Sequence, residues 1–234
     1  MQRLLQRLSN IFNALLAAFG KRHWWPGETR LEVIVGAILT QNTSWKNVEK
    51  AIDNLKAMNL LDVGALHALS MEQLAKVIRP SGFYNVKSKR LKSFVKVLHD
   101  EFSGAISNLD VLGTAELRKL LLRIEGIGNE TADSILLYAL NRPIFVVDAY
   151  TKRFLVNHGL YTGDGTYDDV QSFFMEHLPP DTYLFNEFHA LIVCLCQNYC
   201  RKVPACAACP LREDLNGHKN GLSGIENYLD RFSS

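Results

Sequence analysis

The stretch LLRIEGIGNETAD, residues 121–133, decides the fold class of this chain. A segment with apolar residues at helical spacing runs into Gly126-Ile127-Gly128, and a second helical segment begins at once. Two glycines around one aliphatic residue permit a tight turn with positive φ, while Ile127 can anchor the turn in the core. We therefore expect two helices joined by a glycine hairpin.

The start of the second helix in this hairpin predicts an anion-binding site. Its first backbone N–H groups have no partner within the helix, and the helix dipole favours negative charge there. A DNA phosphate would satisfy both, and such a contact positions a protein without reading sequence. A Gly-X-Gly turn alone is more often a simple connection between helices, so the prediction depends on the rest of the chain.

The remaining segments also predict helices. The chain has 234 residues, 47% of them hydrophobic, and its one β-rich run, residues 144–147, is short. Thr29 followed by Glu32 indicates a capping box at the start of an early helix. Apolar residues at helical spacing in residues 1–25, interrupted by arginines, favour an amphipathic first helix over a signal sequence. No run of about eighteen apolar residues exists, so we expect no helix that spans a membrane. The helical patterns and this absence together predict an all-α, cytoplasmic protein.

The charge distribution points to a polyanionic partner. The formal net charge is only +2, but seven basic residues and no acidic one lie between Lys76 and Lys96. From Phe154 to Cys200 there are six acidic residues and no Lys or Arg. This asymmetry favours one basic face, although a solvated helix face would give the same pattern.

A single aspartate stands out beyond the hairpin. Asp148 follows the apolar pair Val146-Val147 and precedes a helical segment, twenty residues after Gly128. An aspartate in this place serves as a helix N-cap, or its carboxylate faces an extruded nucleotide. The local sequence leaves both interpretations open.

Five segments in order resemble one known family. They are LTQNT at 39–43, GFYNVK at 82–87, the glycine turn at 126–128, VVD at 146–148 and a late cysteine cluster. Together they resemble the endonuclease III branch of the helix-hairpin-helix DNA glycosylases, over roughly residues 20 to 215. The resemblance implies a two-lobed all-α fold. Residues 31–142 would form a six-helix barrel lobe with the hairpin, and residues 1–30 plus 143–234 a terminal helical lobe.

The resemblance also implies a partner and roles for named residues. The partner is double-stranded DNA with a damaged base, which a monomer would bind and flip out of the stack. Asp148 would be the catalytic carboxylate, and Gln41 would fill the gap that the flipped base leaves. The residues implied to bind DNA are Gln41, Asn42, Lys87, Gly126, Gly128 and Thr131.

The chemistry of base removal suits these residues. Breaking the N-glycosidic bond develops positive charge on the sugar, which a nearby carboxylate stabilises. Family members that also cut the strand use a lysine in the second hairpin helix, and the matching residue here is Glu130. Because a carboxylate cannot form an imine, we expect a monofunctional glycosylase without lyase activity.

Tryptophans indicate the substrate. Trp24-Trp25-Pro26, together with Trp45 after the LTQNT segment, is similar to the 3-methyladenine DNA glycosylases of this superfamily. That similarity implies an aromatic pocket for alkylated purines, such as 3-methyladenine and 7-methylguanine, formed by Trp25 and Trp45 with Trp24 and Glu130. Cationic lesions are attracted to an indole face, but core packing explains any one tryptophan equally well. A glycosylase for oxidised pyrimidines or mismatched bases, and a non-catalytic DNA-binding protein, are the alternative functions.

All five cysteines lie between residues 194 and 209. Cys200, Cys206 and Cys209 resemble three ligands of the family's [4Fe–4S] cluster, which four thiolates normally hold. The expected fourth cysteine, about six residues after the last pair, is absent, so Cys196 or His218 is the candidate fourth ligand in a loop near 194–216. A structural zinc, or buried thiols without a metal, are the alternatives. His189, on an apolar segment, is expected to be structural.

Overall fold

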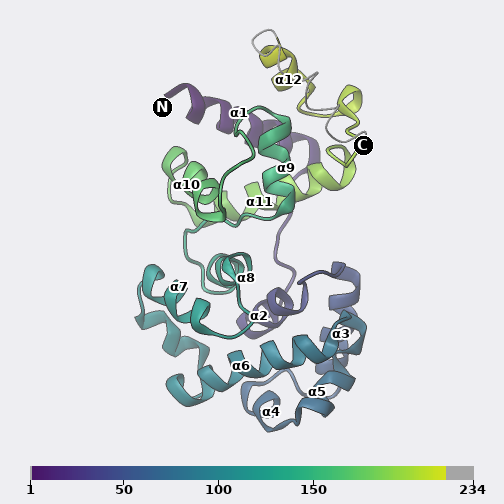
Figure 1. The fold of residues 1–234 in the computed structure, drawn as a ribbon, viewed down its shortest axis with the longest axis vertical. Helices are drawn as coiled ribbons and strands as arrows, with labels where there is room; N and C mark the ends of the chain where they lie inside the picture. The colour runs from purple at the N-terminus through teal and green to yellow at the C-terminus, as the bar shows by residue number, and fades with distance from the viewer. Residues whose placement is uncertain (1, 220–234) are drawn as a thin grey trace. The chain divides into compact units, whose positions relative to one another are not determined.

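The computed structural model describes residues 2–219, with the side chains of residues 2–215. The chain forms two compact units (Figure 1), one of residues 24–146 and one of residues 1–23 with 147–234. The regular elements of the described residues are all helical, which confirms the all-α prediction. The resemblance predicted lobes of residues 31–142 and of residues 1–30 plus 143–234. These boundaries differ by a few residues from those of the two units, and they stay a prediction.

The unit of residues 24–146 is built around α2 (Arg30–Leu39), whose residues 31–39 are all buried. The helices α3, α6 and η3 pack against it. In chain order the other elements are α3 (Trp45–Ala57), α4 (Val63–Ala68), α5 (Met71–Val77), η1 (Arg79–Ser81), α6 (Tyr84–Phe102), η2 (Ile106–Val111), α7 (Thr114–Arg123), α8 (Asn129–Ser134) and η3 (Ile135–Ala139), a π-helical turn.

The start of α2 shows how local sequence fixes this unit. The Thr29 side chain accepts a hydrogen bond from the Glu32 backbone N–H at 3.1 Å, so Thr29 is the N-cap. The Glu32 carboxylate accepts from the Glu28 N–H at 3.0 Å, one residue before the position that a capping box requires. The predicted cap is therefore confirmed, with its reciprocal bond shifted by one residue.

The long helix α6 lies across this unit against α4 and α5 (Figure 1). Lys92 ties it to α4, because its Nζ donates to the carbonyl oxygens of Leu66, His67 and Leu69. These carbonyls end α4, where no helical N–H is left to bind them. Part of the basic stretch expected to face a polyanion is thus used inside the fold.

The second unit is built around α11 (Thr182–Asn198), with α1 (Gln2–Phe19) and α9 (Ala149–Asn157) packed against it. Its other elements are α10 (Tyr167–His177), η4 (Cys206–Ala208) and α12 (Arg212–Lys219). Leu8, Ile11 and Leu15 are the buried residues of α1, as expected of an amphipathic first helix. Among the described residues, none of the helices is both long and apolar enough to cross a membrane.

Candidate functional site

The hairpin between α7 and α8 adopts the predicted turn, with a different use for each glycine. Ile127 is 5% exposed and anchors the turn in the core, as expected. Gly126 has φ +85°, a conformation that favours glycine. Gly128 is the N-cap of α8 with φ −95°, which any residue adopts, and a Cβ added there would meet open space. The turn therefore has the expected positive φ at Gly126, whereas the missing side chain of Gly128 leaves the N-terminus of α8 uncovered.

Gln41 is fastened to this hairpin. Its Nε2 donates to the Thr131 hydroxyl at 2.9 Å and to the Gly126 carbonyl at 3.3 Å. Its Oε1 accepts from the Arg90 guanidinium of α6. The structure thus brings Gln41, Gly126 and Thr131 together and adds Arg90, which sequence reasoning did not select. Asn42 is exposed beside them at φ +54°.

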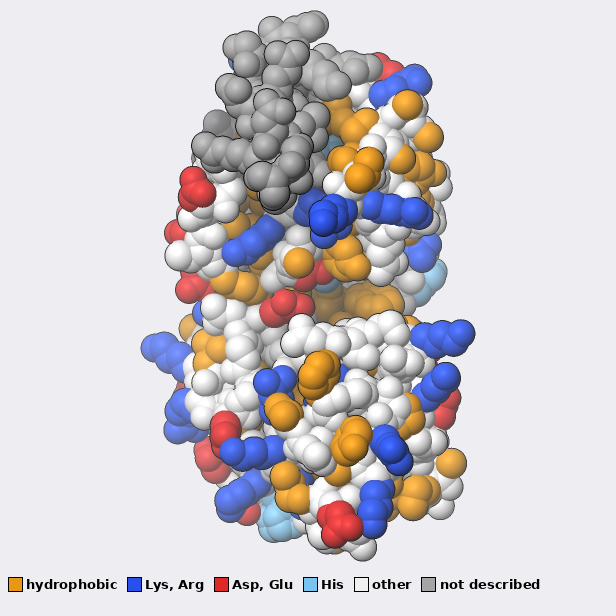
Figure 2. Space-filling model, turned by 45° about the vertical axis from the view of Figure 1, so that its right-hand side comes forward, with side chains coloured by type: hydrophobic (Ala, Val, Ile, Leu, Met, Phe, Trp, Pro, Cys, Tyr) orange, Lys and Arg blue, Asp and Glu red, His pale blue; other side chains and the backbone are white. Residues whose placement is uncertain are grey.

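The basic stretch does not form a uniform cationic face. Lys87 is 1% exposed and donates to the Ser81 carbonyl at 2.6 Å, so it organises the turn before α6. Burial, and then the charge of Arg90, lower the Lys87 pKa to about 8. Lys89 pairs with Glu125. On the face that Figure 2 displays, Lys and Arg side chains are interspersed with acidic and apolar ones. The expected contact of Lys87 with a phosphate stays a prediction.

In the unit of residues 24–146, three tryptophans and one tyrosine form an aromatic cluster, which we define as Trp24, Trp25, Trp45 and Tyr138. The Trp25 ring centroid lies 4.9 Å from that of Trp24, 5.1 Å from that of Trp45 and 5.2 Å from that of Tyr138. Trp25 packs on α2 at Gly36, where an added Cβ would stand 2.9 Å from its Nε1. The rings contact each other, so a base would stack on the outside of the cluster or displace one ring.

Glu130 and Tyr138 come from the second hairpin helix and its continuation. Glu130 is exposed in the first turn of α8, where the helix dipole stabilises a carboxylate. Tyr138 lies in η3, the π-helical continuation of α8. Sequence reasoning missed Tyr138 because it falls within an apolar run that is read as core.

In the other unit, Asp148 is the N-cap of α9 and also faces a histidine. Its Oδ1 accepts from the Thr151 N–H at 2.7 Å and from the Thr151 hydroxyl at 2.9 Å. Its Oδ2 lies 3.5 Å from Nε2 of His189 on α11, and its side chain is only 14% exposed. Burial raises the Asp148 pKa, but His189 and Thr151 together outweigh burial and hold this pKa below its ordinary value. The two interpretations of Asp148 are therefore compatible, because one oxygen caps the helix and the other does not.

The cysteines spread over the end of α11, the turn after it and η4. The Cys196 thiol lies against that of Cys200, and this contact lowers the Cys200 pKa and raises that of Cys196. Asn157 Nδ2 donates to Cys200 Sγ at 3.1 Å, and the Leu211 N–H donates to Cys209 Sγ at 3.4 Å. Cys194 instead bonds with Asn198 on its own helix. The His218 side chain lies outside the described residues.

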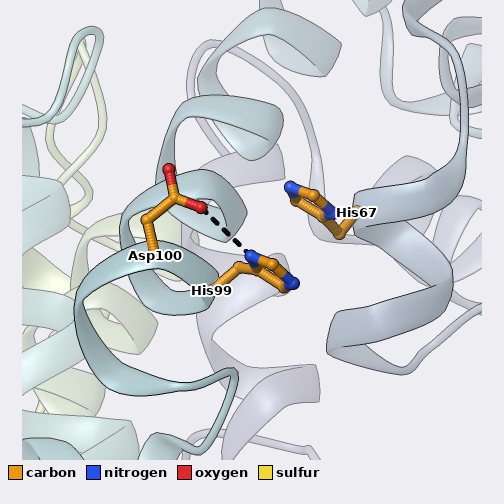
Figure 3. A group of neighbouring side chains, drawn as sticks. All are labelled: His67, His99 and Asp100. Atoms are coloured by element: carbon orange, nitrogen blue, oxygen red, sulfur yellow. Dashed lines mark hydrogen bonds and ion pairs between the residues drawn. The ribbon is translucent and has the colours of Figure 1, made fainter.

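A third cluster lies on the surface of residues 24–146. His67 of α4 and His99 of α6 stack at 3.9 Å with ring planes 2° apart, and His99 Nδ1 lies 3.0 Å from Asp100 Oδ1 (Figure 3). Parallel rings direct their nitrogen lone pairs along parallel planes instead of toward one point. Lys96 also binds the second Asp100 oxygen. We therefore assign these residues no metal site.

The comparisons with known proteins decide the family. Residues 35–180 match the HhH-GPD superfamily base excision DNA repair proteins. This chain belongs to that superfamily. A protein of Methanocaldococcus jannaschii that is named as a DNA repair glycosylase is 47% identical over 210 residues, which cover 89% of this chain and 95% of that protein. Endonuclease III of Sulfolobus acidocaldarius is 25% identical over 191 residues, which cover 80% and 82%.

Solved structures of the superfamily share the fold. The 3-methyladenine DNA glycosylase of H. pylori, bound to 1,N6-ethenoadenine, is 31% identical with a TM-score of 0.69, over 82% of this chain and 94% of that chain. A non-covalent endonuclease III–DNA complex has a TM-score of 0.76 at 18% identity, over 92% and 98%, and supports the fold alone. The predicted resemblance to helix-hairpin-helix glycosylases is confirmed.

The two hairpin glycines make a matched test of this HhH-GPD protein. Gly126→Ala should destabilise the fold by about 1–3 kcal/mol, because alanine is strained at positive φ, and its Cβ would lie 2.2 Å from Arg90 Cγ. Gly128→Ala should change stability by less than about 0.5 kcal/mol yet weaken binding to undamaged duplex, because its methyl group stands at the open N-terminus of α8. Denaturant unfolding and fluorescence anisotropy measure both. Equal destabilisation by the two substitutions would contradict the assignment.

Proposed function

We propose that this protein is a monofunctional DNA N-glycosylase that flips alkylated purines, 3-methyladenine above all, and removes them hydrolytically. The observation that carries the proposal is the buried Asp148 carboxylate, whose lowered pKa keeps it ionised at neutral pH. A charge held in a site of low solvent exposure acts strongly on a developing ribosyl cation. Phosphate binding alone has no use for such a group, which argues against a non-catalytic DNA-binding protein.

Hydrolysis without strand cleavage is supported by the hairpin helix. The first turn of α8 reads Asn129-Glu130-Thr131, and none of these side chains can form a Schiff base with the sugar. Lys152, at the start of α9, points its Nζ to the Gly165 carbonyl at 3.3 Å. We therefore propose that the product is an intact strand with an abasic site.

The choice of alkylated purines is supported by the aromatic cluster and by the 31% identical 3-methyladenine glycosylase. Purines alkylated at N3 or N7 are cationic as nucleosides, so an indole face attracts them. Their glycosidic bonds are already weak, so stacking and charge can select them without a strong acid to protonate the base. Glu130 adds negative charge on the same unit.

Asp148→Asn tests the catalytic assignment. Asparagine is as good an N-cap as aspartate, so the fold should persist. Base release should fall by roughly two to three orders of magnitude, while affinity for duplex DNA stays near that of the wild type. The assay uses duplexes with 3-methyladenine, 7-methylguanine, thymine glycol or a G·T mismatch, with and without alkali.

Each outcome of that assay has one meaning. Alkali-dependent cleavage at alkylated purines, lost in Asp148→Asn, supports the proposal. Nicking at thymine glycol without alkali would indicate an endonuclease III-like activity instead. Unchanged release by Asp148→Asn would show that another group is the catalytic carboxylate.

Trp45 is the member of the cluster on which the pocket can be tested. It is half-buried, and its Nε1 donates to Glu49 at 2.7 Å, so its loss should disturb the core less than that of Trp25. We expect Trp45→Ala to lower kcat/KM for 7-methylguanine about tenfold or more, since stacking on an aromatic ring contributes roughly 1–3 kcal/mol per base. Trp45→Phe should retain most of the activity. Equal kcat/KM in the alanine variant would contradict a pocket at this residue.

We also propose that Cys196, Cys200, Cys206 and Cys209 hold a [4Fe–4S] cluster, with zinc as the alternative for the same ligand set. The donor chemistry fits, because thiolates are the usual ligands of both groups, and the Cys196 and Cys200 thiols already lie in contact. The N–H groups of Asn157 and Leu211 that point at two of the sulfurs are the kind of contact that tunes such clusters. When bound, the cluster would be a structural cross-link that shapes the loop with Arg201 and Lys202.

Metal analysis of two serine variants tests the cluster. Anaerobically purified protein should be brown and contain about four iron atoms per chain. Cys209→Ser should lose this iron, whereas Cys194→Ser should keep it, because Cys194 bonds only within α11. Zinc in place of iron would select the alternative, and protein without either metal would overturn the proposal.

A further inference from the structure

The Gln41 carboxamide is held at both ends. Its amide nitrogen donates to Thr131 and to the Gly126 carbonyl, and its oxygen accepts from Arg90. Three elements therefore meet at one side chain, namely the segment after α2, the hairpin and α6. The hydrogen bond from Arg90 is charge-assisted, which makes it the strongest class of the three.

Arg90 reaches Gln41 by crossing the hairpin turn. A Cβ on Gly126 would stand 2.2 Å from Arg90 Cγ and 2.8 Å from both its Cδ and its Nε. The aliphatic stem of Arg90 therefore lies directly on Gly126, and a residue with a side chain at 126 would displace it. Gly126 is needed for this close approach as well as for its positive φ.

The neighbouring basic residues of α6 have other partners. Lys87 donates to the Ser81 carbonyl, and Lys89 pairs with Glu125 at 2.6 Å. Arg90 is thus the basic residue of this turn of α6 that binds Gln41. Its planar fork allows it to orient an amide oxygen while its stem stays packed, which the single ammonium of a lysine does less well.

We propose that Arg90 is a positioning residue, which orients Gln41 to fill the gap that a flipped base leaves in the DNA stack. By binding the Gln41 oxygen, it holds the carboxamide on the hairpin, so that the anion-binding site and the gap-filling side chain approach the duplex as one rigid group. Less conformational freedom of Gln41 is then lost when it enters the stack. This inference rests on the proposed function and on the role that the family resemblance implies for Gln41, which is to fill the space left by the flipped base.

The test distinguishes positioning of Gln41 from a general attraction of the Arg90 charge to DNA. The probes are an intact duplex and the same duplex with a tetrahydrofuran abasic site beside 2-aminopurine, whose fluorescence reports the filling of the gap. Binding to both gives the preference for the gapped duplex as a ratio of affinities. The variants are Arg90→Met, Gln41→Ala and the double substitution. Lys89→Met is the matched control, because it removes one charge from the same turn.

Arg90→Met should lower the preference for the gapped duplex by roughly 2- to 12-fold, the range for the conformational freedom of one side chain that is ordered on binding. The double variant should be no worse than Gln41→Ala alone, because the two side chains act as a unit. Lys89→Met should weaken binding to both duplexes equally and leave the ratio unchanged. Melting temperatures check that each variant is folded.

Two results would overturn the inference. One is that Arg90→Met behaves as Lys89→Met does, with equal loss on both duplexes. The other is that the effects of Arg90→Met and Gln41→Ala multiply in the double variant. Base release from alkylated DNA is measured separately, so a wild-type protein that releases no base but shows the coupling would refute the proposed chemistry and retain the role of Arg90.

Discussion

The proposed chemistry of this protein depends on how one carboxylate, that of Asp148, is held. Asp148 has two oxygens with two tasks, since Oδ1 caps α9 through Thr151 and Oδ2 faces His189 of α11. Burial raises its pKa, but His189 and the Thr151 donors outweigh burial and hold the pKa below its ordinary value. The cap also fixes the direction of the carboxylate before any substrate arrives. Pre-orientation of this kind is the main means by which a protein stabilises developing charge.

The other residues with proposed roles are found in both units. Residues 24–146 carry the hairpin, Gln41 with Arg90, and the aromatic cluster, which are the groups suited to DNA backbone, gap and base. Residues 1–23 with 147–234 carry Asp148, His189 and the cysteines, which are the groups suited to the sugar and to the metal. Within this second unit, buried Glu187 accepts hydrogen bonds from the N–H groups of Arg22 and His23 and so anchors the chain just before Trp24. Each unit therefore orders its own functional groups through its own hydrogen bonds.

The sequence predicted the features that depend on local chemistry. Helical periodicity, the Thr29 cap and the buried Ile127 between two glycines required only neighbouring residues. Features that depend on tertiary contacts were missed. Nothing near Lys87 indicates that its ammonium is buried on Ser81, and nothing near Arg90 indicates that it binds Gln41, forty-nine positions away. His189 reads as a core histidine on its own helix and gains its role only from Asp148.

The central claim is that Asp148 stabilises a positively charged sugar, and a transition-state mimic tests it directly. The measurement is the affinity for duplex DNA that carries a cationic pyrrolidine in place of the damaged nucleotide, relative to the same duplex with a neutral tetrahydrofuran. The wild-type protein should prefer the cation, and Asp148→Asn, which retains the helix cap, should lose that preference while its affinity for the neutral duplex is unchanged. An equal preference for the cation in both proteins would contradict the account.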